Sequence, residues 1–122
     1  MAIHNEFGKE AEIKAAEFLE EKNYKILHRN WRFLKAEIDI IAEDLHSNQI
    51  VIVEVKARKF NPLVTPEEAI TKTKRKLLVQ AANEFIISHN IQKETRFDVI
   101  IIYKSSQKWE INHIENAFLS FE

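Results

Sequence analysis

Two apolar segments of the sequence carry charged side chains whose types and spacing suit phosphate chemistry. Asp39 lies in the first segment, residues 37–41, and Glu54 and Lys56 lie in the second, residues 50–58. A carboxylate among β-branched residues loses hydration, so it needs a cation, a proton or a hydrogen-bond donor beside it. Charges placed in this way mark a candidate site rather than ordinary protein surface.

The geometry of a β-sheet predicts how these three side chains meet. Residues two apart on a strand point to the same face, so Glu54 and Lys56 are expected to face the same way. If residues 43–49 form a hairpin turn, Asp39 comes to lie beside Glu54 on the neighbouring strand. Mg²⁺ typically binds one or two carboxylates and keeps waters and phosphate oxygens as its other ligands. The spacing therefore favours metal and phosphate chemistry, and a surface ion pair between Glu54 and Lys56 is the competing interpretation.

A helix is predicted from about residue 5 to residue 22, and it offers a further acid. Its apolar residues Phe7, Ala11 and Phe18 recur at helical spacing. Glu12 lies at the edge of this apolar stripe, so its carboxylate is expected to point towards the protein body. The alternative for Glu12 is a carboxylate on the helix surface.

The remaining segments predict an α/β domain with a mixed β-sheet flanked by helices. A first strand is expected at residues 24–33, and two late strands are expected at residues 96–103 and 108–114. A helix is predicted to follow the capping pattern at residues 65–68, with a second cap at Thr71. The order is one helix, three strands, a second helix and two strands.

Basic residues gather in two segments, although the whole chain has a net charge of −1. Residues 23–35 contain four Lys or Arg residues and no acid, and residues 54–76 contain seven basic and three acidic residues. Such clusters can present a basic face to nucleic acid, with an ordinary solvated helix face as the alternative. The candidate nucleic-acid contacts are Arg32, Arg58, Lys72, Lys74 and Arg75. Of these, Arg32 and Arg58 flank the acidic pair most closely.

Composition sets the outer limits of the interpretation. The 122 residues are 45% hydrophobic and include no cysteine, which predicts one domain, residues 1–122, that builds its core without disulfides. No apolar run has the length of a membrane span, and the first residues lack a signal-peptide pattern, so a cytoplasmic protein without membrane contact is expected. The five histidines are scattered, which argues against a zinc site or a histidine-based triad. Asp98 is expected to pair with Arg96 or to cap its strand rather than to bind metal.

The order of Asp39 and the tripeptide Glu54-Val55-Lys56 resembles the motif of the PD-(D/E)xK nuclease superfamily. The chain as a whole resembles the YraN family of small bacterial proteins, also called UPF0102. The stretches that carry this resemblance include Gly8 with Glu12, residues 30–32, 37–41 and 53–56, Lys74, residues 96–99 and residues 116–118. The resemblance implies a restriction endonuclease-like core.

The resemblance also implies roles for the site residues. Asp39 and Glu54 would hold one or two Mg²⁺ or Mn²⁺ ions, and Lys56 would position the attacking water or stabilise developing charge. In related resolvase-like nucleases a glutamate of the opening helix joins the metal site, and Glu12 occupies the matching position.

Three functions of different classes follow as hypotheses. The first is a Mg²⁺-dependent nuclease that hydrolyses phosphodiester bonds in DNA, including branched or junction DNA. The second is a nucleic-acid-binding or partner-binding module that keeps the nuclease fold without cleavage. The third is an oligomerisation scaffold whose basic segments are buried against another subunit. The sequence leaves the oligomeric state open, a homodimer included.

Overall fold

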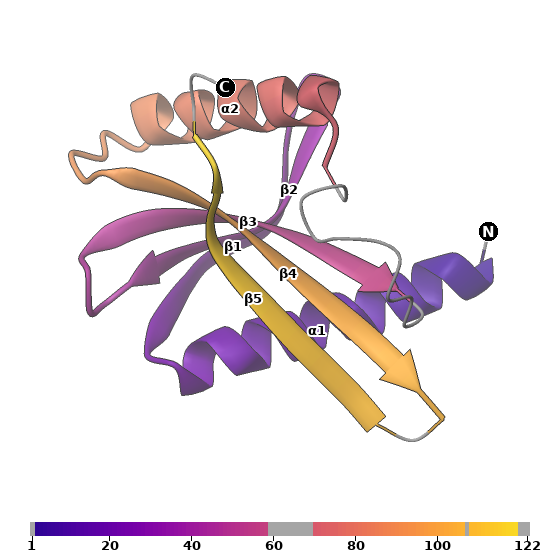
Figure 1. Ribbon diagram of the computed structural model, residues 1–122. Coiled ribbons are helices and arrows are strands. Elements are labelled where there is room, and N and C mark those ends of the chain that lie inside the picture. The colour runs from indigo at the N-terminus through magenta and orange to yellow at the C-terminus, as the bar shows by residue number, and fades with distance from the viewer. Residues whose placement is uncertain (1, 59–69, 107, 120–122) are drawn as a thin grey trace.

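The computed structural model describes residues 2–58, 70–106 and 108–119, and within them it forms a mixed sheet between two helices (Figure 1). The strands are hydrogen-bonded in the order β1-β2-β3-β4-β5, with β3 and β4 parallel and the other neighbours antiparallel. This arrangement is the predicted α/β fold, and it is consistent with a restriction endonuclease-like core. The elements are α1 (Ala2–Glu21), β1 (Tyr24–Phe33), β2 (Ala36–Asp44), β3 (Gln49–Arg58), α2 (Lys72–Ser88), β4 (Thr95–Ser105) and β5 (Lys108–Phe118).

The two helices cover opposite faces of the sheet, and each face has its own apolar core (Figure 1). Because side chains alternate between faces along a strand, neighbouring residues of the central strands supply both cores. On the α1 side the core includes Ala15, Leu19, Ile40, Val53 and Ile100. On the α2 side it includes Ile52, Leu78, Ala82, Phe85 and Ile101. Neither helix in the described residues is long and apolar enough to cross a membrane.

The strands are longer than the sequence pattern predicts at two places. The turn between β2 and β3 is shorter than the predicted residues 43–49, because β2 continues to Asp44 and that carboxylate accepts hydrogen bonds from the backbone N–H groups of His46 and Ser47 at 3.0 and 3.3 Å. Strand β5 continues beyond the predicted end at residue 114, with a register shift in its pairing to β4, so that Phe118 stacks on Phe97 at 4.9 Å between ring centroids. Polar residues near the end of β5 hide this continuation from the sequence pattern.

Helix α2 begins at the second of the two predicted caps. Thr71 has an extended backbone, and its Oγ1 accepts a hydrogen bond from the backbone N–H of Lys74 at 3.2 Å. The other predicted cap, in residues 65–68, lies outside the described residues. The apolar stripe of α2 is buried, with Leu78 and Phe85 facing the sheet.

Removing the Thr71 cap is expected to destabilise the protein modestly. In Thr71→Ala the N–H of Lys74 loses its side-chain acceptor, which should lower the free energy of unfolding by about 1 kcal/mol. Urea unfolding followed by circular dichroism measures this change. The matched control is Thr73→Ala, an exposed position in the first turn of α2, where alanine's higher helix propensity should leave stability unchanged or slightly raised. Equal effects of the two substitutions would contradict the capping role.

Candidate active site

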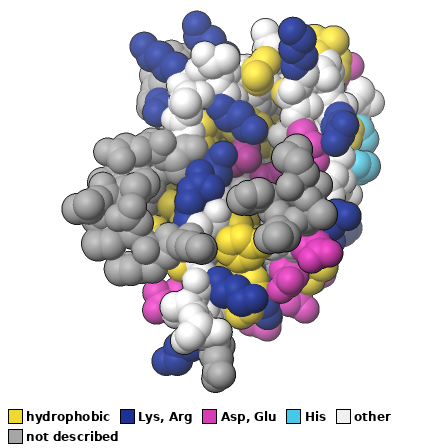
Figure 2. Space-filling model, turned by 90° about the vertical axis from the view of Figure 1, so that its right-hand side faces the viewer, with side chains coloured by type: hydrophobic (Ala, Val, Ile, Leu, Met, Phe, Trp, Pro, Cys, Tyr) yellow, Lys and Arg dark blue, Asp and Glu magenta, His cyan; other side chains and the backbone are white. Residues whose placement is uncertain are grey.

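A cleft of about 710 Å³ opens between the first half of α1, the β1–β2 hairpin and the first turn of α2. Side chains of both charges line it. The acids are Glu12, Glu37 and Asp39, and the bases are Lys9, Arg29, Arg32 and Lys74. Seen from the right-hand side of Figure 1, Lys and Arg side chains border an acidic spot in the upper centre of the face (Figure 2). The cleft therefore combines an acidic floor with a basic border.

Asp39 lies where strand β2 separates from strand β3. The backbone pairing of the two strands ends at Ile40 and Val53, one residue before Asp39 and Glu54 would face each other. Beyond that point the Asp39 Oδ2 atom accepts a hydrogen bond from the backbone N–H of Val55 at 2.8 Å. The carboxylate thus replaces the backbone carbonyl that a continuing ladder would provide, and the strand separation makes room for it. This places Asp39 beside Glu54, as predicted.

Glu54 is the most buried acid of the site, with 5% of its surface exposed. Its Oε1 atom lies 3.9 Å from Lys56 Nζ, which confirms that the two side chains share a face, and its Oε2 atom lies 3.8 Å from Lys74 Nζ of α2. Both distances are those of ion pairs that are too long for hydrogen bonds. Within the described residues, Oε2 is buried and has no hydrogen-bond partner.

Burial and mutual repulsion raise the pKa values of these acids. Burial raises the pKa of Glu54 to about 8, and the nearby charge of Asp39 adds to the rise, while Lys74 and Lys56 oppose it. Burial likewise raises the pKa of Asp39, although the hydrogen bond from Val55 opposes this. At neutral pH the pair therefore retains a proton, which a bound cation would displace.

Glu12 faces the same cleft from helix α1. Burial, and next the charge of Asp39, raise its pKa to about 7 against the opposing effects of Arg29 and Asn30. Arg29 Nη2 lies 3.9 Å from Glu12 Oε1. The prediction that Glu12 points towards the protein body is confirmed, since its carboxylate joins Asp39 at the cleft. Whether it contacts a metal stays a prediction.

Two polar residues of β1 complete the site, and the sequence did not single them out for it. Arg29 and Asn30 line the cleft. With its amide oriented to satisfy its neighbours, Asn30 donates to Glu12 Oε1 at 2.9 Å and to Glu37 Oε1 at 3.1 Å. Asn30 has a positive φ of 54° in the middle of a strand. An asparagine inside a strand pattern, where this residue type is disfavoured, was the signal that could have identified it.

The five predicted nucleic-acid contacts fall into two groups. Arg32 and Lys74 line the cleft. The other three lie outside its lining: Lys72 is exposed at the start of α2, Arg58 donates to the Ala57 carbonyl oxygen at 3.0 Å, and Arg75 donates to the Ile70 carbonyl oxygen at 3.3 Å. Their contact with nucleic acid stays a prediction.

The donor set suits a hard divalent cation held by two carboxylates. In the described part of the chain, no three Asp, Glu or His side chains are arranged as a complete metal site. Asp39 and Glu54 nevertheless offer oxygen ligands only, and one buried oxygen of Glu54 has no hydrogen-bond donor among the described residues. A cation in this place would take its other ligands from water or a phosphate, as Mg²⁺ commonly does.

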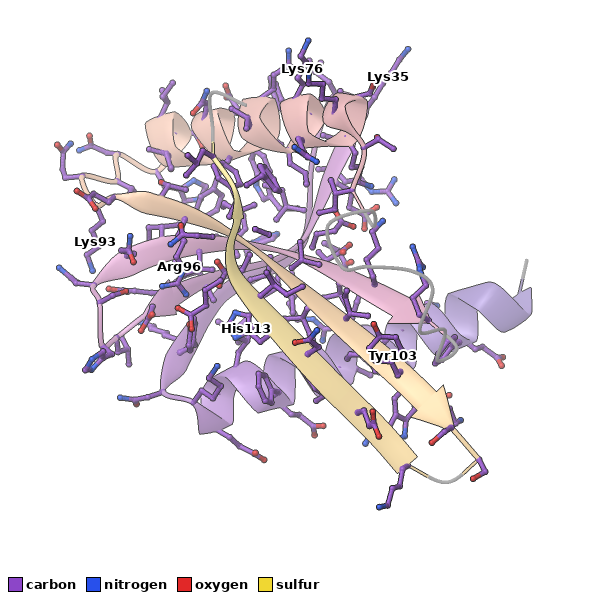
Figure 3. All side chains as sticks on the ribbon, viewed as in Figure 1. Lys35, Lys76, Lys93, Arg96, Tyr103 and His113 are labelled. Atoms are coloured by element: carbon purple, nitrogen blue, oxygen red, sulfur yellow. The ribbon has the colours of Figure 1, made fainter. Side chains whose placement is uncertain are left out.

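A second buried charge cluster, on the other side of the sheet from α2, holds Asp98 and Arg96. Arg96 Nε and Nη2 donate to the two Asp98 oxygens at 2.9 Å each, so the predicted ion pair is confirmed. His113 Nε2 lies 2.7 Å from Asp98 Oδ2 and contributes from β5 (Figure 3). Burial raises the pKa of Asp98. The hydrogen bonds from His113 and Arg96 together have the larger effect and hold this pKa below its usual value. Both oxygens of the Asp98 carboxylate have hydrogen-bond partners within the protein, which fits a structural role.

Comparison with known proteins places the chain in a family. A sequence model described as the uncharacterised protein family UPF0102 matches residues 11–102. A UPF0102 protein of Flavobacterium psychrophilum is 46% identical, over 99% of this chain and 100% of its own length. A UPF0102 protein of Flavobacterium johnsoniae is 41% identical, over 99% of this chain and 100% of its own length. A UPF0102 protein of Phocaeicola vulgatus is 40% identical, over 97% of this chain and 96% of its own length. The chain belongs to the UPF0102 family.

Proposed function

We propose that the protein is a metal-dependent nuclease that hydrolyses phosphodiester bonds in DNA. The observation that carries the proposal is the acidic pair of the half-buried Asp39 and the buried Glu54. The Glu54 carboxylate lies beside Lys56 and Lys74, and one of its oxygens has no hydrogen bond among the described residues. Retaining buried, mutually repelling acids is costly unless a ligand uses them. The cleft that Asp39 lines, together with Lys9, Arg29, Arg32 and Lys74, suits a phosphate chain.

Each side chain has a distinct role in this proposal. Asp39 and Glu54 would hold Mg²⁺ or Mn²⁺, and Glu12 would assist from the other wall of the cleft. Such a cation, when bound, supplies Lewis-acid catalysis and activates water. Lys56 positions the attacking water or stabilises the negative charge that develops on the phosphate oxygens. Arg32 and Lys74 hold the DNA backbone.

The pKa of Glu12 supports a further contribution to hydrolysis. A group with a pKa of about 7 is balanced between its two protonation states at neutral pH, which is the favourable range for proton transfer in catalysis. Glu12 could therefore accept a proton from water at the cleft. The Asn30 amide and Arg29 hold its carboxylate in place.

A second candidate function, DNA binding without cleavage, is favoured by one observation. Lys56 and Lys74 both lie within 4 Å of Glu54 and partly balance the acidic pair without any metal. A metal-free network of this kind could persist as a structural element on a binding module. Binding that depends on salt, without cleavage in any divalent metal, would support this second function.

The test is cleavage of linear, single-stranded, flapped and four-way-junction DNA in Mg²⁺ or Mn²⁺. Lys56→Ala is expected to lower turnover roughly 100-fold, because it removes a charge that acts mainly in the transition state. Metal affinity, measured by calorimetry, should change little. The matched control is Lys25→Ala, at the other end of β1 from the cleft. Full activity of folded Lys56→Ala would exclude the assigned role, and loss of cleavage in Asp39→Asn would support the metal site.

A further inference from the structure

The β1–β2 hairpin contains a backbone conformation that its residue type does not favour. In the described parts of the chain, six non-glycine residues have a positive φ, and five of them are asparagine: Asn23, Asn30, Asn48, Asn90 and Asn116. The sixth is Leu34, with φ 56°. Asparagine tolerates the left-handed region, whereas leucine is strained there. Leu34 is therefore the one described residue with a positive φ that is not asparagine.

The geometry of the turn requires a positive φ at residue 34, but it does not explain why this residue is leucine. Phe33 pairs with Ala36, so Leu34 and Lys35 form a two-residue connection with positive φ at its first position. Glycine is the usual residue at this position of a type II′ turn. The Leu34 side chain is 80% exposed, so burial in the protein core does not compensate for the strain. A residue type that the turn does not favour, and whose strain packing does not offset, is typical of functional positions.

The surroundings of Leu34 indicate what it contacts. Arg32, two residues earlier, has a side chain that is 77% exposed and lines the cleft. Lys35 follows Leu34, and Figure 3 shows Lys35 and Lys76 of α2 at the same end of the molecule, both extending away from the sheet. An apolar tip between cations suits a nucleic acid, whose phosphates attract the cations and whose base steps admit an apolar side chain. A purely apolar protein partner would offer no negative charge to Lys35 and Lys76.

We propose that Leu34 is an apolar wedge that enters an opened base step of branched DNA held in the cleft. This inference rests on the proposed function and deepens it, because it names the substrate class as DNA with a break in base stacking, such as a junction or a fork. Arg32 links the wedge to the cleft, since it lies on the same hairpin as Asp39. Leu34 is a specificity residue in this scheme and takes no part in the chemical step.

The experiment compares Leu34→Asn with Ile87→Asn, a matched control. Ile87 is 74% exposed and lies near the far end of α2 from the hairpin. The probes are a four-way junction, a fork and a linear duplex of the same sequence, each with 2-aminopurine at the branch position. Binding and fluorescence are measured in Ca²⁺ to prevent turnover. Leu34→Asn should bind the junction and the fork roughly tenfold more weakly and lose the fluorescence rise that reports unstacking. Its affinity for the linear duplex should be unchanged.

Stability separates this effect from misfolding. Because asparagine relieves the strained φ, Leu34→Asn should be at least as stable as the wild type in urea, while Leu34→Met should keep junction binding. Unchanged junction preference in Leu34→Asn, or equal wild-type affinity for junction and duplex, would overturn the wedge and leave the nuclease proposal standing. A wild type that binds no DNA would overturn both. A dimer that Leu34→Asn converts to monomer, with DNA binding unchanged, would assign the tip to an interface between copies and also overturn the wedge.

Discussion

Asp98→Ala is expected to lower the free energy of unfolding by about 3–5 kcal/mol, because it leaves a buried guanidinium without its main partner. Arg96 is 4% exposed, and both Asp98 oxygens accept its hydrogen bonds at 2.9 Å. The same substitution removes the acceptors of His113 Nε2 and of the Asn116 backbone N–H. Asp44 already accepts a hydrogen bond from Arg96 Nη1 at 3.0 Å, so it does not replace the acceptors that Nε and Nη2 lose. Urea unfolding at pH 7 measures the loss.

An exposed ion pair provides the control for Asp98→Ala. Arg32 Nη2 and Glu37 Oε2 lie 3.2 Å apart on the β1–β2 hairpin, where the Arg32 side chain is 77% exposed and the Glu37 side chain is 36% exposed. Arg32→Ala should therefore cost less than about 1 kcal/mol. A cost for Asp98→Ala that is as small as this would show that water enters the cluster and that the network contributes little. The lowered pKa of Asp98 adds a second check: its stabilising effect should be present above the unfolded pKa and should be lost as the pH falls through the folded value.

This network marks a limit of what the sequence could predict. The pairing of Arg96 with Asp98 follows from alternation along one strand, because residues two apart share a face. Other partners of Arg96 include the Tyr24 hydroxyl and Asp44, which are 72 and 52 residues away in sequence. They meet only because β1, β2, β3 and β4 are neighbours in the sheet, and one sequence shows strand positions without showing strand order.

The candidate site was more predictable than the cluster around Arg96, because its signal is local. Glu54 and Lys56 are charged residues inside one apolar strand, and Asp39 lies one hairpin away. The strand separation at Asp39 was not predictable, because regular alternation would place Ile38 and Ile40 on the same face of the sheet. In the structure, Ile38 packs in the core on the α2 side and Ile40 packs in the core on the α1 side. The strict alternation of a flat strand is thus broken between them. Twist and strand curvature of this kind depend on how the sheet packs on its helices.

The fold was predictable to the level of element order, with errors at the ends of elements. Periodicity identified the two helices and five strands of the described residues, since apolar stripes with periods of 3.6 and 2 are strong signals. The end of β5 was missed because the polar residues Glu115 and Asn116 interrupt its apolar pattern, although the strand continues to Phe118. The strained Leu34 was equally hidden, because an ordinary leucine between Phe33 and Lys35 gives no indication of its φ.

Glu54→Gln is expected to abolish cleavage and, in EDTA, to make the protein more stable at alkaline pH. The folded-state pKa of Glu54 is about 8, above its ordinary value of 4.5. Between these values the native state holds a proton that the unfolded state releases, so wild-type stability should fall as the pH rises from about 4.5 to 8. Glutamine does not titrate and keeps nearly the same shape. The variant should therefore exceed the wild type by about 2–4 kcal/mol at pH 8.5 and should match it near pH 4.

Metal should reverse this order of stability, and the reversal tests the site without any activity assay. A divalent cation that binds the ionised native pair stabilises the wild type in proportion to the logarithm of metal concentration above its Kd. Glu54→Gln lacks one of the two carboxylates, so its melting temperature should change little with Mg²⁺ or Mn²⁺. The wild-type affinity for metal should also fall as the pH decreases below about 8, because protons compete for Glu54.

Glu37→Gln separates this effect from a general loss of negative charge in the cleft. Glu37 lines the same cleft but is more exposed than Glu54 and is paired with Arg32, so its removal should leave both the pH trend and the metal response in place. If Glu54→Gln were less stable than the wild type at pH 8.5 in EDTA, the carboxylate would be stabilising through Lys56 and Lys74, as the non-catalytic function requires. If it were more stable but unable to respond to metal, the two buried acids would be maintained at the expense of stability. Such a cost is expected of residues retained for a cation and its chemistry rather than for the fold.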